Sequence, residues 1–135
     1  MLAQEPPNAG LAEADQLRQQ GTQQFNRRQT QQALETFQHE LELRRQLGDL
    51  EGKWISLGWI GLIYQQFGQY QQALDRYQEG LRIAQTSEDS RGEGVMFNNI
   101  GFIYNNLKTP YIKWFKIFQE ALFIGQHSGQ TVEIT

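Results

Sequence analysis

Three glycines at one constant spacing limit what this chain can fold into. Gly21, Gly61 and Gly101 recur every 40 residues along the 135-residue sequence. Four positions before each glycine stands an apolar residue, in turn Leu17, Leu57 and Phe97. A glycine inside a helix costs about 1 kcal/mol relative to alanine, and two antiparallel helices approach closely only where a side chain is nearly absent. The spacing therefore predicts a repeated unit of two closely packed helices.

The second half of the unit supplies an aromatic ring to fill the space left by the glycine. Ala33 and Ala73 lie twelve residues after the first two glycines, and Phe37 and Tyr77 lie four residues further on. We expect each ring to interlock with the glycine of its own unit. The pattern predicts six helices, over residues 11–26, 30–47, 51–67, 70–86, 91–107 and 110–127.

The segments between units carry residues that end one helix and begin the next. Gly48 is suited to end the second helix and Asp49 to cap the third, and Asp89 is one of three candidate caps a unit later. Nearby, the stretch 92–94 has two glycines but lacks the Gly-Lys-Ser/Thr ending of a phosphate-binding loop, so we interpret it as a turn.

This pattern resembles the tetratricopeptide repeat, whose first helix carries W-x2-L-G-x2-Y and whose second carries A-x3-F. The corresponding residues of the middle unit are Leu57, Ile60, Gly61, Tyr64, Ala73 and Tyr77. The 40-residue period resembles the longer-helix variety found in kinesin light chains and Pins-type polarity adaptors. The resemblance implies an all-α fold of three helical hairpins, stacked as a short right-handed superhelix (an α-solenoid) with the first helices on its concave side.

The same resemblance divides the chain into parts. We expect a flexible tail over residues 1–10, a repeat array over 11–127, and a C-terminal tail over 128–135. The repeats cover about 11–50, 51–90 and 91–127.

The last expected helix departs from the pattern, because it is apolar nearly all round. Trp114 replaces the small Ala73 of the middle unit, and Ile112, Ile117 and Phe123 stand where that unit has polar side chains. A helix that is apolar on all sides is normally buried. Three interpretations stay open: it packs against further repeats outside this sequence, against a second copy of the chain, or into the groove as a lid. With its interleaved lysines, it could also lie on a membrane surface.

Composition excludes several classes of protein. The formal net charge is -3, with both signs scattered, so the chain lacks the basic footprint of a nucleic-acid-binding protein. There is no cysteine for disulfides, thiolate metal sites or nucleophilic catalysis. No apolar run is long enough to span a membrane, and the first residues do not form a signal peptide. We expect a cytoplasmic protein, or an exported, periplasmic one if a signal peptide was removed.

Residues suited to catalysis or metal binding are few and scattered. His39 and His127 are far apart in the pattern and are interpreted as surface residues. Glu35 and His39 are the only near match to the spacing of helical metal ligands, and one acid with one imidazole does not make a site. We therefore expect no enzyme activity, no metal and no cofactor. If the chain were an enzyme in its own right, it would need a metal or cofactor that co-purifies with it.

The resemblance places a peptide-binding groove on the first helices. The side chains expected to line it are Arg18, Thr22, Phe25, Asn26, Ile55, Leu62, Gln65, Gln66, Asn98, Phe102 and Asn105. Amides offer both a donor and an acceptor, which suits gripping the main chain of an extended peptide; the alternative is that they are only solvated helix surface. The lysine and asparagine clamp of the chaperone-binding subclass is absent.

These expectations define a protein–protein interaction scaffold that binds a peptide or protein segment in its concave groove. A first alternative is a regulatory or sensor fragment of a larger multidomain bacterial enzyme or signalling protein. A second is a module that self-assembles as a homo-oligomer through its last helix. The residues that would carry this self-association are Ile112, Trp114, Ile117 and Phe123.

Overall fold

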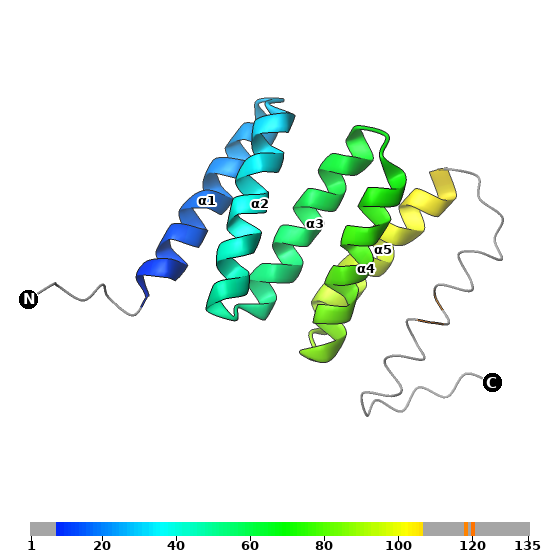
Figure 1. Cartoon of the computed structure of the whole chain (residues 1–135). Coiled ribbons are helices and arrows are strands. Elements are labelled where there is room, and N and C mark those ends of the chain that lie inside the picture. The colour runs from blue at the N-terminus through cyan, green and yellow to red at the C-terminus, as the bar shows by residue number, and fades with distance from the viewer. Residues whose placement is uncertain (1–7, 107–117, 119, 121–135) are drawn as a thin grey trace, which may run out of the picture.

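The computed structural model describes residues 8–106 together with Phe118 and Glu120. Within these residues the chain forms helices and no strands. The helices are α1 Ala9–Asn26, α2 Thr30–Leu47, α3 Leu50–Gln66, α4 Tyr70–Thr86 and α5 Ser90–Asn106 (Figure 1). All five agree with the predicted helices to within two residues at each end. The sixth predicted helix, over 110–127, lies outside the described residues apart from Phe118 and Glu120.

The helices pack as successive hairpins. α1 packs against α2 and α3 against α4, while α2 meets α3, α4 meets α5, and α3 also contacts α5. The hairpins follow one another side by side across the molecule (Figure 1). This arrangement is an all-α solenoid of helical hairpins, as the sequence predicts.

A close contact between a glycine and an aromatic ring joins the two helices of each described hairpin. A Cβ atom at Gly21 would lie 2.8 Å from Cε1 of Phe37, and one at Gly61 would lie 2.5 Å from Cε1 of Tyr77. Both rings are fully buried. The predicted interlocking of ring and glycine is therefore confirmed in the first two units.

Two apolar clusters form the core. One joins α2 to α3 and contains Ala33, Leu34, Phe37, Leu41, Leu57, Ile60 and Ile63. The other joins α3, α4 and α5 and contains Trp54, Ala73, Leu74, Tyr77, Leu81, Ala84, Met96, Ile100 and Ile103. The core therefore runs across the boundaries between units, as expected for a repeat protein whose units bury their apolar faces against their neighbours.

The predicted helix ends are confirmed, with one correction. Gly48 ends α2 with a left-handed φ of 67°, and the Asp49 side chain accepts a hydrogen bond from the Gly52 amide at 3.0 Å. Asp89 accepts one from the Gly92 amide at 3.1 Å. The interpretation of residues 92–94 as a turn is wrong, because they lie inside α5, which Asp89 caps.

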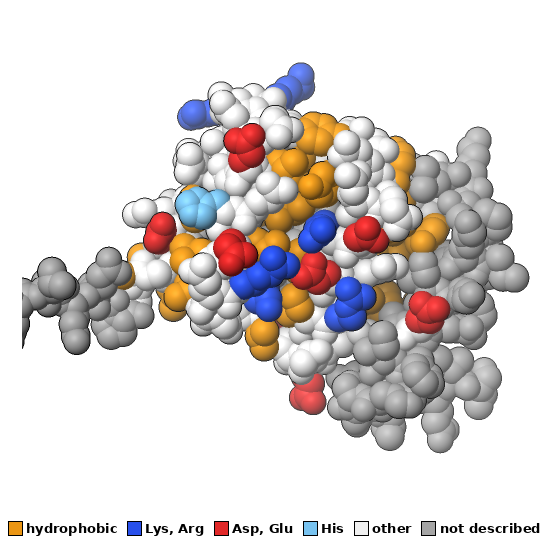
Figure 2. Space-filling view, in the orientation of Figure 1, with side chains coloured by type: hydrophobic (Ala, Val, Ile, Leu, Met, Phe, Trp, Pro, Cys, Tyr) orange, Lys and Arg blue, Asp and Glu red, His pale blue; other side chains and the backbone are white. Residues whose placement is uncertain are grey.

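Charged side chains of both signs are interspersed over the middle of the face that Figure 2 shows. An ion pair joins the second helices of neighbouring hairpins, with Arg45 Nη2 2.8 Å from Oε1 of Glu79. Arg76 of α4 lies 3.3 Å from Oε2 of the same carboxylate. This face thus has no continuous patch of one sign. Among the described helices, none is both long and apolar enough to cross a bilayer.

Candidate functional site

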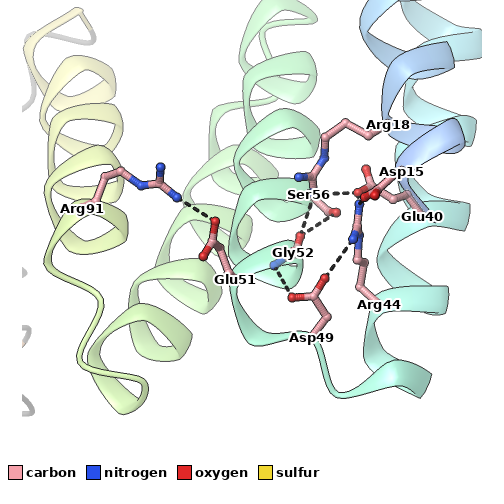
Figure 3. A network of polar contacts seen from close by, with 9 residues as sticks. All are labelled: Asp15, Arg18, Glu40, Arg44, Asp49, Glu51, Gly52, Ser56 and Arg91. Carbon is pink, nitrogen blue, oxygen red and sulfur yellow. Dashed lines mark hydrogen bonds and ion pairs between the residues drawn. The ribbon is translucent and has the colours of Figure 1, made fainter. Parts of the chain in front are cut away.

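The first helices of the three units lie next to one another and form one surface. Arg18 of α1 donates from Nη2 to the carbonyl oxygen of Gly52 in α3 at 3.1 Å. Arg91 of α5 lies 2.8 Å from Oε1 of Glu51 in α3 (Figure 3). We call this surface the first-helix face. Besides Glu51 and Arg91 it comprises residues 15, 18, 22 and 26 of α1, residues 55, 58, 62, 65 and 66 of α3, and residues 95, 98, 102, 105 and 106 of α5.

Equivalent residues of this face stand 40 positions apart and differ between units. At the end near the helix C-termini the residues are all exposed amides, namely Asn26, Gln66 and Asn106. One turn earlier, the residues change from Thr22 through half-buried Leu62 to Phe102, whose side chain is 55% exposed. The face is therefore polar along one edge and becomes more apolar from α1 to α5.

Four residues predicted to line the groove are engaged in contacts within the chain. Phe25 meets the edge of the Trp59 ring with centroids 5.4 Å apart. Gln65 accepts a hydrogen bond from the Tyr77 hydroxyl at 2.9 Å. Thr22 donates to the Arg18 carbonyl at 2.8 Å, and Arg18 itself is held by the contacts described below. These four residues hold the helices in position. A ligand could contact only those of their atoms that remain exposed.

The predicted amides of α5 differ from these four residues. Asn98 and Asn105 are exposed, and neither side chain has a hydrogen-bond partner among the described residues. Asn106 donates from Nδ2 to the carbonyl of Phe102 at 2.8 Å. The described residues thus leave the donors and acceptors of Asn98 and Asn105 available. The residues predicted to carry self-association, Ile112, Trp114, Ile117 and Phe123, lie outside the described residues.

An ionic network with two buried members, Glu40 and Arg44, reaches the first-helix face and was missed by sequence reasoning (Figure 3). Its centre is Arg44 of α2, whose residue is 3% exposed. Nη2 of Arg44 lies 2.8 Å from Asp15 of α1, Nη1 lies 2.8 Å from Asp49, and Nε lies 2.9 Å from Glu40. One guanidinium therefore ties together α1, α2 and the start of α3.

Glu40 is the second buried member of this network. Its side chain has no exposed surface, and its Oε2 also lies 2.6 Å from Nη2 of Arg18. Among the described residues, Oε1 of Glu40 and Nε of Arg18 have no hydrogen-bond partner. Glu40 thus holds Arg18 at the border between the interior and the first-helix face.

The carboxylates around Arg44 raise its pKa by more than burial lowers it. Loss of solvation alone would lower the pKa of Arg44, but hydrogen bonds to Asp15, Glu40 and Asp49 raise it above its ordinary value. The guanidinium therefore stays charged, as it does in nearly all proteins.

The next junction along the array has no such network. Glu40 and Arg44 are replaced 40 positions later by Gly80 and Ala84, both buried. Met96 of α5 fills the space, with its sulfur 3.1 Å from where a Cβ of Gly80 would stand. A comparison of the two units could have indicated this network from the sequence. Two positions four residues apart hold a Glu and an Arg in the first unit and small residues in the second.

The described His, Asp and Glu side chains were candidates for a metal site. Within residues 8–106, with Phe118 and Glu120, no group of three or more His, Cys, Asp or Glu side chains is arranged to hold a metal ion. His39 is exposed on α2, in agreement with its interpretation as a surface residue.

The stacked hairpins and the shared first-helix face define a helical-repeat protein. Comparison with models of protein families matches the tetratricopeptide repeat over residues 14–86, which is more than half of the chain. The chain belongs to this family. Comparisons with curated proteins and with solved structures give no match.

Proposed function

We propose that this protein is an interaction scaffold that binds an extended peptide segment of a partner across its first-helix face. Tetratricopeptide repeats generally mediate protein–protein interactions, and the constant 40-residue period supports the variety with longer helices. The observation that carries the proposal is that the amides of Asn98 and Asn105 are exposed on that face and have no hydrogen-bond partner in the part of the chain that the structure describes. We propose no catalytic role.

The geometry of an extended chain suits this arrangement. A peptide in extended conformation rises about 3.3 Å per residue and presents alternating N–H and C=O groups. The first helices meet through the contacts of Arg18 with Gly52 and of Arg91 with Glu51, so a peptide that crosses the face encounters successive first helices. An asparagine amide both donates and accepts, so it can bind main-chain groups whatever the sequence of the ligand.

The test is a double substitution, Asn98→Ala with Asn105→Ala. Peptides are first selected on the wild-type chain from a phage-displayed library of random dodecapeptides, and the tightest binder is synthesised. Two hydrogen bonds, each contributing about 0.5–1.5 kcal/mol, together contribute about 1–3 kcal/mol, which predicts an affinity loss of about five- to 150-fold. Isothermal titration calorimetry measures it.

The matched control removes exposed amides from the second helices, Gln46→Ala in α2 with Gln72→Ala in α4. This control should bind the peptide as the wild type does. Equal affinity of the Asn98/Asn105 variant and the wild type, with helicity unchanged by circular dichroism, would refute the proposal.

A further inference from the structure

The first-helix face carries an exposed apolar strip on α5. Val95 and Phe102 are seven residues apart and so lie on the same side of the helix. Their exposed fractions are 40% and 55%, and Phe102 is the most exposed of the large hydrophobic side chains described. On α3 the strip continues through the half-buried Ile55 and Leu62.

The strip ends at α1, where polar residues replace the apolar ones. The equivalents of Val95 and Phe102 in α1 are Asp15 and Thr22. Asn98 and Asn105 flank Phe102 on α5, and within residues 8–106 their amides have no hydrogen-bond partner. An apolar strip bordered by unpartnered amides matches a polypeptide, which presents main-chain polar groups next to its side chains.

The charged side chains of this face already have partners within the chain. Every charged side chain of the first-helix face has an ion-pair partner, and the pairs are Asp15 with Arg44, Arg18 with Glu40, and Glu51 with Arg91. A charged ligand residue would have to compete with these pairs, two of which include a buried partner. The face therefore offers no unpaired charged side chain to a charged peptide.

We propose that the bound segment is uncharged and seats a bulky apolar side chain against Val95 and Phe102, with its main chain at Asn98 and Asn105. This inference rests on the proposed function and adds to it the chemistry of the ligand. Contact between apolar side chains is insensitive to salt, whereas ion pairs at a surface are screened. Binding should therefore depend on Phe102 and remain nearly constant with ionic strength.

The probe is again the phage-displayed dodecapeptide library, selected on the full chain. We expect a consensus with one bulky apolar position and few charged residues. The affinity of the synthesised peptide should change less than about threefold between 50 and 500 mM NaCl, because no ion pair with the protein is screened. Phe102→Ser should weaken binding about tenfold or more, because the apolar contact is lost.

The control is Phe67→Ser, which removes another exposed ring, 42% exposed, from the residue after α3 and outside the first-helix face. It should leave affinity unchanged, and the urea midpoints of both variants should stay close to that of the wild type. A consensus rich in Asp, Glu, Lys or Arg, or an affinity that falls with salt, would overturn the inference.

Two further outcomes separate this inference from the proposed function. Peptides weakened by the Asn98/Asn105 substitutions but not by Phe102→Ser would overturn the inference and support the proposed function. Peptides insensitive to both sets of substitutions, or a library that yields no binder, would count against both.

Discussion

Substitution of alanine for Gly61 tests the contact that holds a hairpin together. The added Cβ would lie 2.5 Å from Cε1 and 2.7 Å from Cδ1 of Tyr77. The ring has little freedom to move, because it is fully buried and its hydroxyl donates to Oε1 of Gln65 at 2.9 Å. The helices must therefore separate or the hydrogen bond must be lost.

Two opposing terms set the size of the effect. Overpacking of a well-packed core costs about 1–3 kcal/mol, whereas replacing a helical glycine by alanine gains about 1 kcal/mol. Since the contact is so short, we expect the upper part of the first range and a net loss of about 1–2 kcal/mol. In Gly94→Ala the new Cβ would meet no atom within 4 Å, so only the gain of about 1 kcal/mol remains.

The assay is equilibrium unfolding in urea, followed by far-ultraviolet circular dichroism. The same chemical change should thus shift the midpoint in opposite directions: down for Gly61→Ala and up for Gly94→Ala, with the slope m unchanged. A Gly61→Ala protein as stable as the wild type, with the same m, would refute the argument that the ring requires a glycine.

Two predictions concern charged groups. Arg44→Leu removes a buried partner of three carboxylates and should lower the free energy of unfolding by about 3–5 kcal/mol. The control Arg45→Leu, at the surface, should lower it by at most about 1 kcal/mol. Urea unfolding measures both values, and equal losses would contradict the role of the network. Hydrogen bonds from the Gly92 amide and the Trp54 indole lower the pKa of Asp89. Ionised Asp89 therefore contributes fully to the free energy of unfolding above the unfolded-state pKa of about 3.9, and this contribution is lost as the pH falls through the lower folded-state pKa. Asp89→Asn should therefore lose less stability than the wild type as the pH falls below about 4, and parallel pH profiles would rule this out.

The sequence was sufficient to predict the helices and their pairing. One repeated constraint, a glycine that faces an aromatic ring, recurs at Gly21 with Phe37 and at Gly61 with Tyr77, and the 40-residue comparison located both. The helix end at Gly48 could also be predicted from the sequence, because an αL position at a helix end favours glycine. Local patterns of this kind depend on the chain itself and hold wherever the repeat holds.

The parts that were not predicted depend on which side chains meet across units. From the sequence, residues 92–94 are interpreted as a turn because they are rich in glycine and lack the ending of a phosphate-binding loop. In the structure the buried Gly92 has a packing reason, since a Cβ there would lie 2.8 Å from Ala84 and Trp54 atoms. Similarly, Phe25 and Gln65 fit the expected groove positions, yet they contact Trp59 and Tyr77. Sequence spacing gives the side of a helix, and the rotamers of neighbouring residues decide which atoms remain exposed.

The two junctions between units fix helix orientation by different physical means. Around Arg44, three carboxylates from separate segments must meet one planar guanidinium, and this directional requirement restricts how α1 and α3 sit against α2. Around Met96, a flexible thioether packs between Gly58 and Gly80, a contact that tolerates small shifts. Since a buried ion pair adds little net stability compared with a well-packed apolar core, the network contributes chiefly to geometry. The polar α1 side of the first-helix face is thus held rigidly, and the apolar α5 side, which we propose receives the ligand, rests on the more adaptable junction.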